Sequence, residues 1–227
     1  MASATLITSG GTVTPGGSTD TTASGSWGAN RLQLVGVVSR MNSSVVPNQP
    51  TLSGGPGSWS VVATSPYDST DPSRKRLTLF KSKPSSSGSG ALTVNFVGQT
   101  QTTQSWMWIE IVGGYDVVQS AINSVDGANV LTATLAAFAS SSNVTVGFFG
   151  ADNNTNTFVA GPNSGAFTTV GDDFSATLNI SSEFANSAQT SVDGRYTPSG
   201  VAIGAIAVEI TTTLVSSSSS DALMLLV

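Results

Sequence analysis

Two glutamates in otherwise apolar segments are the residues best suited to acid–base chemistry. Glu110 lies in the run Trp106–Val112, and Glu209 lies in the run Val201–Ile210. Retaining glycosidases hold two carboxyl groups about 5–5.5 Å apart, one as nucleophile and one as acid and base. The alternative is that each glutamate faces solvent or pairs with a basic residue near a strand end. Neither glutamate has a second acidic residue two positions away, so we favour the structural role and expect no enzyme.

Missing residue types exclude several other reactions. The 227 residues contain no histidine and no cysteine. A Ser-His-Asp triad, a cysteine nucleophile and a zinc site built from His and Cys are therefore impossible. We expect no cofactor.

Two acidic segments could bind a cation. Asp152–Asn156 offers side-chain oxygens at alternate positions, as calcium loops do. The calcium-loop pattern then fails, because Thr157 stands where glycine is needed and Asn163 stands where glutamate is needed. Asp172 and Asp173 could also bind a cation, but as part of a turn they need none. We therefore expect no metal.

The four tryptophans could form a stacking surface for sugars. Trp59 alternates with serines and is expected in the core, and Trp27 is expected to anchor the segment before it. Trp106 and Trp108 could form a stacking platform, although core packing is the commoner role of tryptophan in a strand.

Composition favours a folded protein with an unusual surface. Ser and Thr contribute 65 residues, whereas charged residues are only 9% of the chain, against about 25% in ordinary globular proteins. Hydrophobic residues reach 39% with a net charge of −5, which is unlike a disordered chain. The acidic balance also argues against nucleic-acid binding.

Charge is unevenly distributed along the chain. Residues 1–109 hold seven Lys and Arg against three Asp and Glu, and residues 110–227 hold one against ten. Five of the basic residues lie close together: Arg74, Lys75, Arg76, Lys81 and Lys83. They are either a solvated hairpin or an interface, at which the basic half of one subunit meets the acidic half of another.

The hydrophobic pattern has a period of two and predicts an all-β fold. Short segments that alternate Val, Leu or Phe with Thr, Ser or Asn recur between Gly, Pro and Asn clusters. The segments Trp106–Val112 and Val201–Val208 are apolar on both faces, so each is either covered on both sides or meets a partner. We expect one two-sheet antiparallel β-sandwich with Greek-key connections over residues 26–215. Residues 1–25 are expected to form an N-terminal strand and a flexible or partner-bound arm.

The C-terminal segment 216–227 combines a spacer and an apolar end. Five serines precede Asp221 and Ala222, and the chain continues with Leu223, Met224, Leu225, Leu226 and Val227. This segment is either a final edge strand or a tether whose apolar end binds a neighbouring subunit, and we favour the tether. The N-terminus lacks the features of a secretory signal, and no segment could span a bilayer as a helix.

The order of motifs over residues 26–211 resembles a known class of proteins. The motifs are Ser26–Val37, Pro50–Gly55, Ser58–Val62, Arg76–Phe80, Ala91–Phe96 and Trp108–Gly114, followed by the closing strand Ala202–Ile210. Together they resemble the jelly-roll-like structural proteins encoded in the virion modules of tailed phages and prophages. The resemblance implies a jelly-roll fold and a non-enzymatic role as a capsid decoration (cement) protein, a head fibre or a tail-associated protein.

We therefore expect a virion surface protein that is made in the host cytoplasm. Its expected partners are further copies of itself and the major capsid protein or tail proteins, with no nucleic acid and no membrane. The alternative is a carbohydrate-binding module of a tail fibre that recognises a host glycan.

Overall fold

The computed structural model consists of β-strands joined by turns and loops. It describes residues 1–12, 17–41, 45–68, 74–152, 157–163, 165–175, 177–197 and 201–212. These residues contain no helix, and so no helical segment of the length and apolar character that crossing a bilayer requires.

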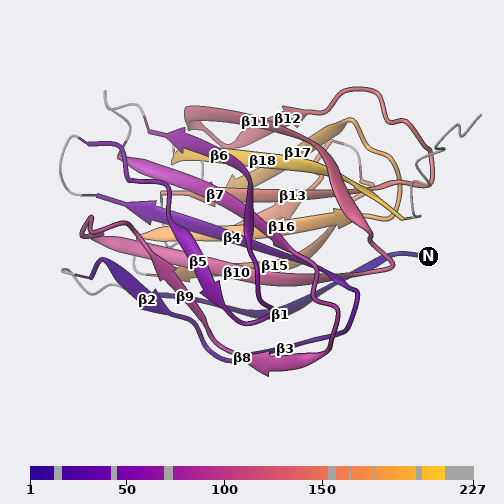
Figure 1. The fold of residues 1–227 in the computed structure, drawn as a ribbon. Helices are drawn as coiled ribbons and strands as arrows, with labels where there is room; N and C mark the ends of the chain where they lie inside the picture. Colours follow the sequence, from indigo (N-terminus) through magenta and orange to yellow (C-terminus); the bar gives the residue numbers. More distant parts are fainter. Residues whose placement is uncertain are drawn as a thin grey trace, which may run out of the picture.

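Two five-stranded antiparallel sheets form the centre of the molecule (Figure 1). The first has the spatial order β1–β10–β4–β7–β6, with bounds Ser3–Thr12, Thr103–Val112, Leu32–Arg40, Lys75–Ser82 and Ser60–Tyr67. The second has the order β11–β18–β13–β16–β15, with bounds Asp116–Ala128, Val201–Thr211, Val144–Ala151, Leu178–Ala185 and Thr168–Ser175. The predicted all-β fold, built from antiparallel sheets, is confirmed.

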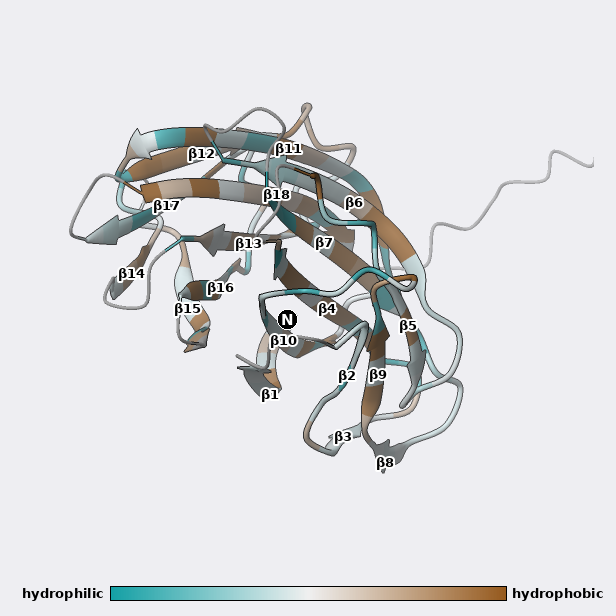
Figure 2. Ribbon diagram, turned by 90° about the vertical axis from the view of Figure 1, so that its left-hand side faces the viewer, coloured by the Kyte–Doolittle hydropathy of each residue, from teal (hydrophilic) through white to brown (hydrophobic). Residues whose placement is uncertain are grey.

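Smaller sheets cover the outer face of each large sheet. The first large sheet is covered by β2–β9–β5 and by the pair β3–β8, with bounds Thr19–Thr21, Leu92–Asn95, Thr51–Gly54, Gly25–Trp27 and Gly88–Gly90. The second is covered by β12–β17–β14, with bounds Val130–Thr134, Ser191–Thr197 and Thr157–Ala160. Figure 2 shows the two sets of small strands on opposite sides of the molecule. The layers therefore number four, with one hydrophobic core between the large sheets and one beneath each outer layer.

The apolar strands β10 and β18 lie inside these layers. Each occupies the second position of its sheet and is buried along nearly its whole length. Met107 and Ile109 face the central core, whereas Trp106 and Trp108 face the outer core of the first half. Of the two alternatives for these segments, the structure shows the first, in which both faces are covered by the chain itself.

The two halves of the chain repeat one strand order. The strands of the first half, without the short pair β3–β8, can be numbered one to eight along the chain. The large sheet then has the order one-eight-three-six-five, and the small sheet has the order two-seven-four. Counting β11 to β18 in the same way gives the same two orders. A β-bulge also interrupts β6 and β15 at the equivalent place, between Val61 and Ala63 and between Thr169 and Gly171. Residues 1–112 (the first half) and 116–212 (the second half) are thus structural repeats.

The halves pack together about an approximate two-fold axis. Contacts between the halves come in equivalent pairs, in which the two halves exchange roles. β1 contacts β15 as β11 contacts β6, and β10 contacts β16 as β18 contacts β7. In the same way, β4 contacts β16 as β13 contacts β7. Such reciprocity is the property of an isologous interface between two identical subunits. The molecule is therefore built like a dimer within one chain.

Residues at equivalent positions face one another along this axis. β4 pairs with β10 in the first half as β13 pairs with β18 in the second half. With these two registers aligned, Gly36 and Phe148 occupy equivalent positions, and so do Arg40 and Asp152. A Cβ atom on Gly36 would lie 2.6 Å from the Phe148 ring. Arg40 forms an ion pair with Asp152, with 3.3 Å between Nη1 and Oδ1. The axis therefore runs along β4 and β13.

The architecture differs from the sequence prediction in two respects. The two large sheets are consistent with the predicted sandwich, but each half adds an outer layer of short strands that was not predicted. The described part of residues 1–25 also forms no free arm, because β1 pairs with β10, β2 pairs with β9, and Gly25 pairs with Gly90. These strands are Gly- and Thr-rich, but sheet pairing satisfies backbone groups without requiring apolar side chains.

Candidate functional site

Glu110 lies on the outer face of the first large sheet and is the centre of a buried hydrogen-bond network. Its carboxylate accepts the Gly28 backbone N–H at 2.6 Å and the Gln33 amide at 2.9 Å, and it pairs with the Arg31 guanidinium at 2.7 Å. Gln33 in turn accepts the Trp108 indole N–H at 3.0 Å. Burial raises the pKa of Glu110, but the hydrogen bonds outweigh burial and leave this pKa below its ordinary value.

Glu209 lies on the outer face of the second large sheet. It is 2% exposed and accepts hydrogen bonds from the side-chain amides of Gln119 and Asn143. The Gln119 amide also pairs with the backbone of Ala136, so it links β11 to the segment that follows β12. Glu209 therefore holds Gln119, and Gln119 joins the second large sheet to its outer layer.

The two glutamates do not form a catalytic pair. Glu110 shares its face of β10 with Trp108, in the core beneath the first outer layer, and Glu209 shares its face of β18 with Ala207, in the core beneath the second. Both large sheets stand between them, and packed sheets lie about 10 Å apart. This separation excludes a retaining glycosidase mechanism in which these two glutamates act together, because that mechanism needs the carboxyl groups about 5–5.5 Å apart.

The predicted basic cluster is divided between the two ends of β7. Arg74, Lys75 and Arg76 lie at its start, whereas Lys81 and Lys83 lie at its other end. Arg76 is bound by the Pro47 carbonyl at 2.6 Å and the Thr64 hydroxyl at 2.8 Å. The five residues are therefore not one surface patch.

Three of these five basic side chains bind acidic residues of their own chain. Arg74 lies 3.6 Å from Asp68. Lys75 is 1% exposed and lies 2.6 Å from Asp68 and 2.9 Å from Asp152. Lys81 pairs with Asp116 at 2.6 Å. Asp116 and Asp152 belong to the second half, so the basic and acidic halves of the sequence meet within one molecule.

The cation candidates are likewise bound by protein groups. Asp152 pairs with Arg40 and Lys75, while residues 153–156 of the proposed calcium loop lie outside the described residues. Asp172 accepts the Ser181 hydroxyl at 2.6 Å, and Asp173 accepts that of Ser9. Among the described residues there is no group of three or more acidic side chains that could hold a metal.

The tryptophans form the core beneath the first outer layer. Trp108 is fully buried, and Trp27 and Trp59 pack against it with ring centroids 5.9 and 6.2 Å away. Trp106 is only 4% exposed. The core role is confirmed for Trp106 and Trp108, and they form no stacking platform.

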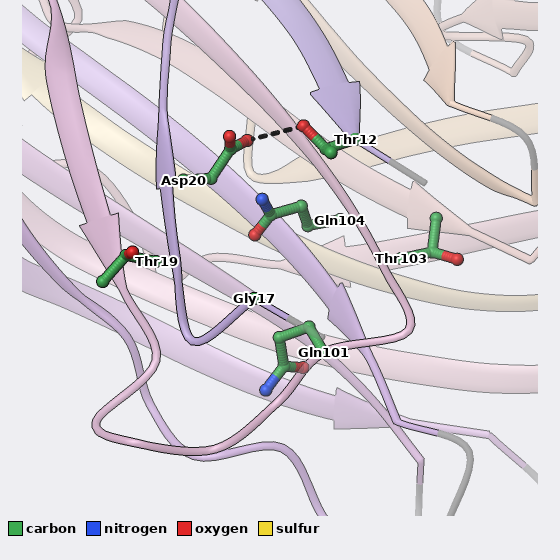
Figure 3. Close-up of a pocket in the computed structure, with 7 residues that line it drawn as sticks. All are labelled: Thr12, Gly17, Thr19, Asp20, Gln101, Thr103 and Gln104. Carbon is green, nitrogen blue, oxygen red and sulfur yellow. Dashed lines mark hydrogen bonds between the residues drawn. The ribbon is translucent and has the colours of Figure 1, made fainter. Parts of the chain in front are cut away.

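A polar cavity lies where the β1–β2 connection meets the start of β10 (Figure 3). Its volume is about 250 Å³, and it is lined by Thr12, Gly17, Thr19, Asp20, Gln101, Thr103 and Gln104. Asp20 accepts the Thr12 hydroxyl at 3.0 Å. The Gln101 amide oxygen is buried and has no hydrogen-bond partner among the described residues. No sequence motif marks this cavity, because its residues come from distant segments.

A groove follows the seam between β6 and β11, the neighbouring edge strands of the two large sheets. One part, of about 320 Å³, is lined by Ser58, Ser60, Lys81, Lys83 and Tyr115, among others. The adjoining part, of about 210 Å³, includes Lys81 again and adds Val61, Val62 and Val118. We call these two parts the seam groove. Sequence reasoning missed it because it forms only when the two halves pack together.

One buried carboxyl group also escaped the sequence analysis. Glu183 is 0% exposed and accepts the Gly161 backbone N–H at 2.9 Å, and its other oxygen has no partner among the described residues. Burial raises the pKa of Glu183 to about 8, although the hydrogen bond from Gly161 opposes this shift. At neutral pH this carboxyl group is largely protonated.

Comparison with protein-family models, with curated proteins and with solved structures yields no significant match to this chain.

Proposed function

We propose that this protein is a non-enzymatic structural component of a virus particle, most simply a capsid decoration protein of a tailed phage. The observation that carries the proposal is the strand order shared by the two halves. In each half the first strand pairs with the last and the second with the next to last. This nesting is the plan of a jelly roll, a fold used by viral capsid proteins and by lectins. Each half departs from that plan in one place, because its fifth strand joins the large sheet.

The surroundings of the polar residues support a structural role. The two glutamates that could have acted together are held apart by both large sheets and hold outer layers in place. Lys75, Arg40 and Asp152 join the halves at one end of the molecule. Polar side chains that are engaged in holding layers and halves together support a protein that presents surfaces rather than one that turns over a substrate.

The expected partners are the assembled particle and further copies of this chain. Lys83 is the exposed member of the basic segment and is best placed to contact a partner. Lys75 is buried, Arg74 and Lys81 pair with Asp68 and Asp116, and Arg76 is bound by the Pro47 carbonyl and the Thr64 hydroxyl. The apolar residues Leu223–Val227 lie outside the described residues, and we retain them as the second contact segment.

Co-sedimentation with particles tests the proposal. Particles that lack the protein are mixed with the purified chain and centrifuged. Saturable binding, in a fixed ratio to the capsid subunits and absent with unassembled capsid protein, is expected, because decoration recognises the assembled form. Failure to bind any particle, head or tail, would refute the assignment.

The polar cavity of Figure 3 favours a second candidate, the recognition of a host glycan. Hydroxyl, amide and carboxylate groups are the partners that sugar hydroxyls require, and the buried Gln101 oxygen is a ready acceptor. Glycan-array binding that Asp20→Asn abolishes would support this candidate. Particle binding that is unaffected by Asp20→Asn would favour decoration.

A further inference from the structure

The seam groove has a basic end and an apolar end. At the basic end, Lys83 lies over the Tyr115 ring, with Nζ 3.2 Å from the ring centroid. Lys81 stands beside it and pairs at 2.6 Å with Asp116, which lines the same end, so two lysines face one aspartate and one positive charge is in excess. Toward the middle of β11 the lining becomes Val61, Val62 and Val118. A ligand that fits this groove carries a negative charge at one end and apolar groups after it.

The apolar end leaves large side chains open to solvent. Val118 is 51% exposed and Val61 is 39% exposed, on two strands that face each other across the seam. Ile122 is 53% exposed and lies two residues beyond Ser120, on the same face of β11. Single exposed apolar residues are ordinary on a protein surface, but a group of them on neighbouring edge strands indicates an interaction site.

One segment of this chain has the matching order of groups. Asp221 is followed by six apolar residues, Ala222–Val227. With Asp221 beside Lys83, an extended segment would run toward Ile122 and place Leu223, Leu225 and Val227 on one face. Charge and apolar character therefore correspond from one end of the groove to the other.

We propose that the seam groove of each molecule receives residues 221–227 of a neighbouring copy. The last described residue, Thr212, donates its hydroxyl to the Ser142 carbonyl at 2.9 Å. Ser142 precedes β13, so the Thr212 side chain points to the β13 side of β18, whereas the groove lies beside β11, on the other side of β18. The eight residues 213–220 can span at most about 26–29 Å, which is enough to reach an adjacent molecule. This inference rests on the proposed self-association and names the surface that provides it.

Cysteine crosslinking distinguishes the docking partner, because the natural chain contains no cysteine. Full-length Val118→Cys and full-length Leu225→Cys are mixed and oxidised, and the 118–225 linked peptide is sought by mass spectrometry. We expect this crosslink in the dimer band. Val97→Cys is the matched control, since Val97 is 58% exposed outside the groove, and it should give no crosslink to position 225.

Sedimentation velocity provides the second measurement. Full-length Val118→Asp and Leu225→Asp should each raise the dissociation constant for self-association at least tenfold, while Val97→Asp leaves it unchanged. A mixture of Val118→Asp and Leu225→Asp should associate more tightly than either variant alone. In the mixture, the intact tail of the first variant can bind the intact groove of the second.

Two results would overturn the inference. A double variant, Val118→Cys with Leu225→Cys, provides the comparison: a 118–225 crosslink that forms within its single chains, but not between the two single variants, means that the tail occupies its own groove. No 118–225 crosslink at all, with self-association unaffected by Val118→Asp, means that the groove has another role. Neither result bears on co-sedimentation with particles, so the proposed function is tested separately.

Discussion

Glu110 and Glu209 occupy the same position in the two halves of this protein. Each lies near the end of the eighth strand of its half and faces the outer layer. Each is bound by residues at or just before the start of the third strand, Arg31 and Gln33 in one half and Asn143 in the other. What looked like a catalytic pair in the sequence is one structural feature repeated.

Substitution of the two glutamates tests this interpretation. Glu110→Gln should lower the free energy of unfolding by about 1.5–3 kcal/mol, because it removes a charged acceptor of several hydrogen bonds. Adding Glu209→Gln should give an additive loss, within about 0.5 kcal/mol, since the two sites share no partner. Urea unfolding at pH 7 measures all three variants. A coupling above about 1 kcal/mol would mean that the two carboxyl groups interact.

The effect of Glu110→Gln should depend on pH. The pKa of Glu110 is lowered in the folded protein, so its contribution is present above the unfolded value of about 4.3 and is lost as pH falls through the folded pKa. Below that folded pKa the wild type and the variant should converge in stability. A difference that persists unchanged at pH 2 would show that lost packing, rather than lost charge, causes the effect.

The packing of Gly36 against Phe148 predicts a coupled pair of substitutions. Gly36→Ala should cost about 1–3 kcal/mol, because the added methyl overlaps the ring. In the background of Phe148→Ala the same change should cost far less, since the ring is gone. Gly90→Ala is the control, because its added methyl would meet only Trp27 atoms at 3.9 and 4.0 Å. Equal costs of Gly36→Ala in both backgrounds would contradict the packing of the halves described above.

Two lysines of β7 should differ sharply in their contribution to stability. Lys75→Met removes the cation between Asp68 and Asp152 and should cost about 3–5 kcal/mol, as expected when one member of a buried ion network is lost. Lys81→Met breaks a partly exposed pair and should cost no more than about 1 kcal/mol. Thermal unfolding of both variants makes the comparison. Similar small losses in both variants would show that the ion pair of Lys75 with Asp152 does not hold the two halves together.

The buried Glu183 predicts a loss of stability as pH rises. Its pKa is raised from 4.5 to about 8 in the folded protein, so between these values the folded state holds a proton that the unfolded state has released. Stability therefore falls from about pH 4.5 to 8. Glu183→Gln should flatten this slope and should be more stable than the wild type at pH 8 by at least about 1 kcal/mol. Identical pH profiles for the two proteins would refute the buried, protonated state.

The sequence predicted strands better than it predicted their arrangement. Alternating residues marked several strands of the large sheets. The runs around Glu110 and Glu209 were recognised as apolar on both faces, but whether this chain or a partner covers them was left open. The duplication was not recognised, and one reason is that equivalent residues on the axis face each other and so are complementary rather than alike. Gly36 is matched by Phe148, and Arg40 is matched by Asp152. Pairs of this kind hide a repeat from any comparison of residue types.

The candidate surfaces were harder to predict for a related reason. The five basic residues from Arg74 to Lys83 looked like one patch, but a strand of eight residues separates its ends by roughly 20 Å or more. The seam groove and the polar cavity each combine residues from distant parts of the chain, Val61 with Val118 and Asp20 with Gln101. The seam groove forms only when the two halves pack together, and the polar cavity forms only when the two ends of the first half come together in the fold.

Cryo-electron microscopy of purified particles tests the central claim most directly. If the protein is a virion structural component, density for its four β-layers should appear at regular positions on the particle surface and disappear from particles made without the gene. Complete particles that contain no such density, and whose protein content lacks this chain, would contradict the account.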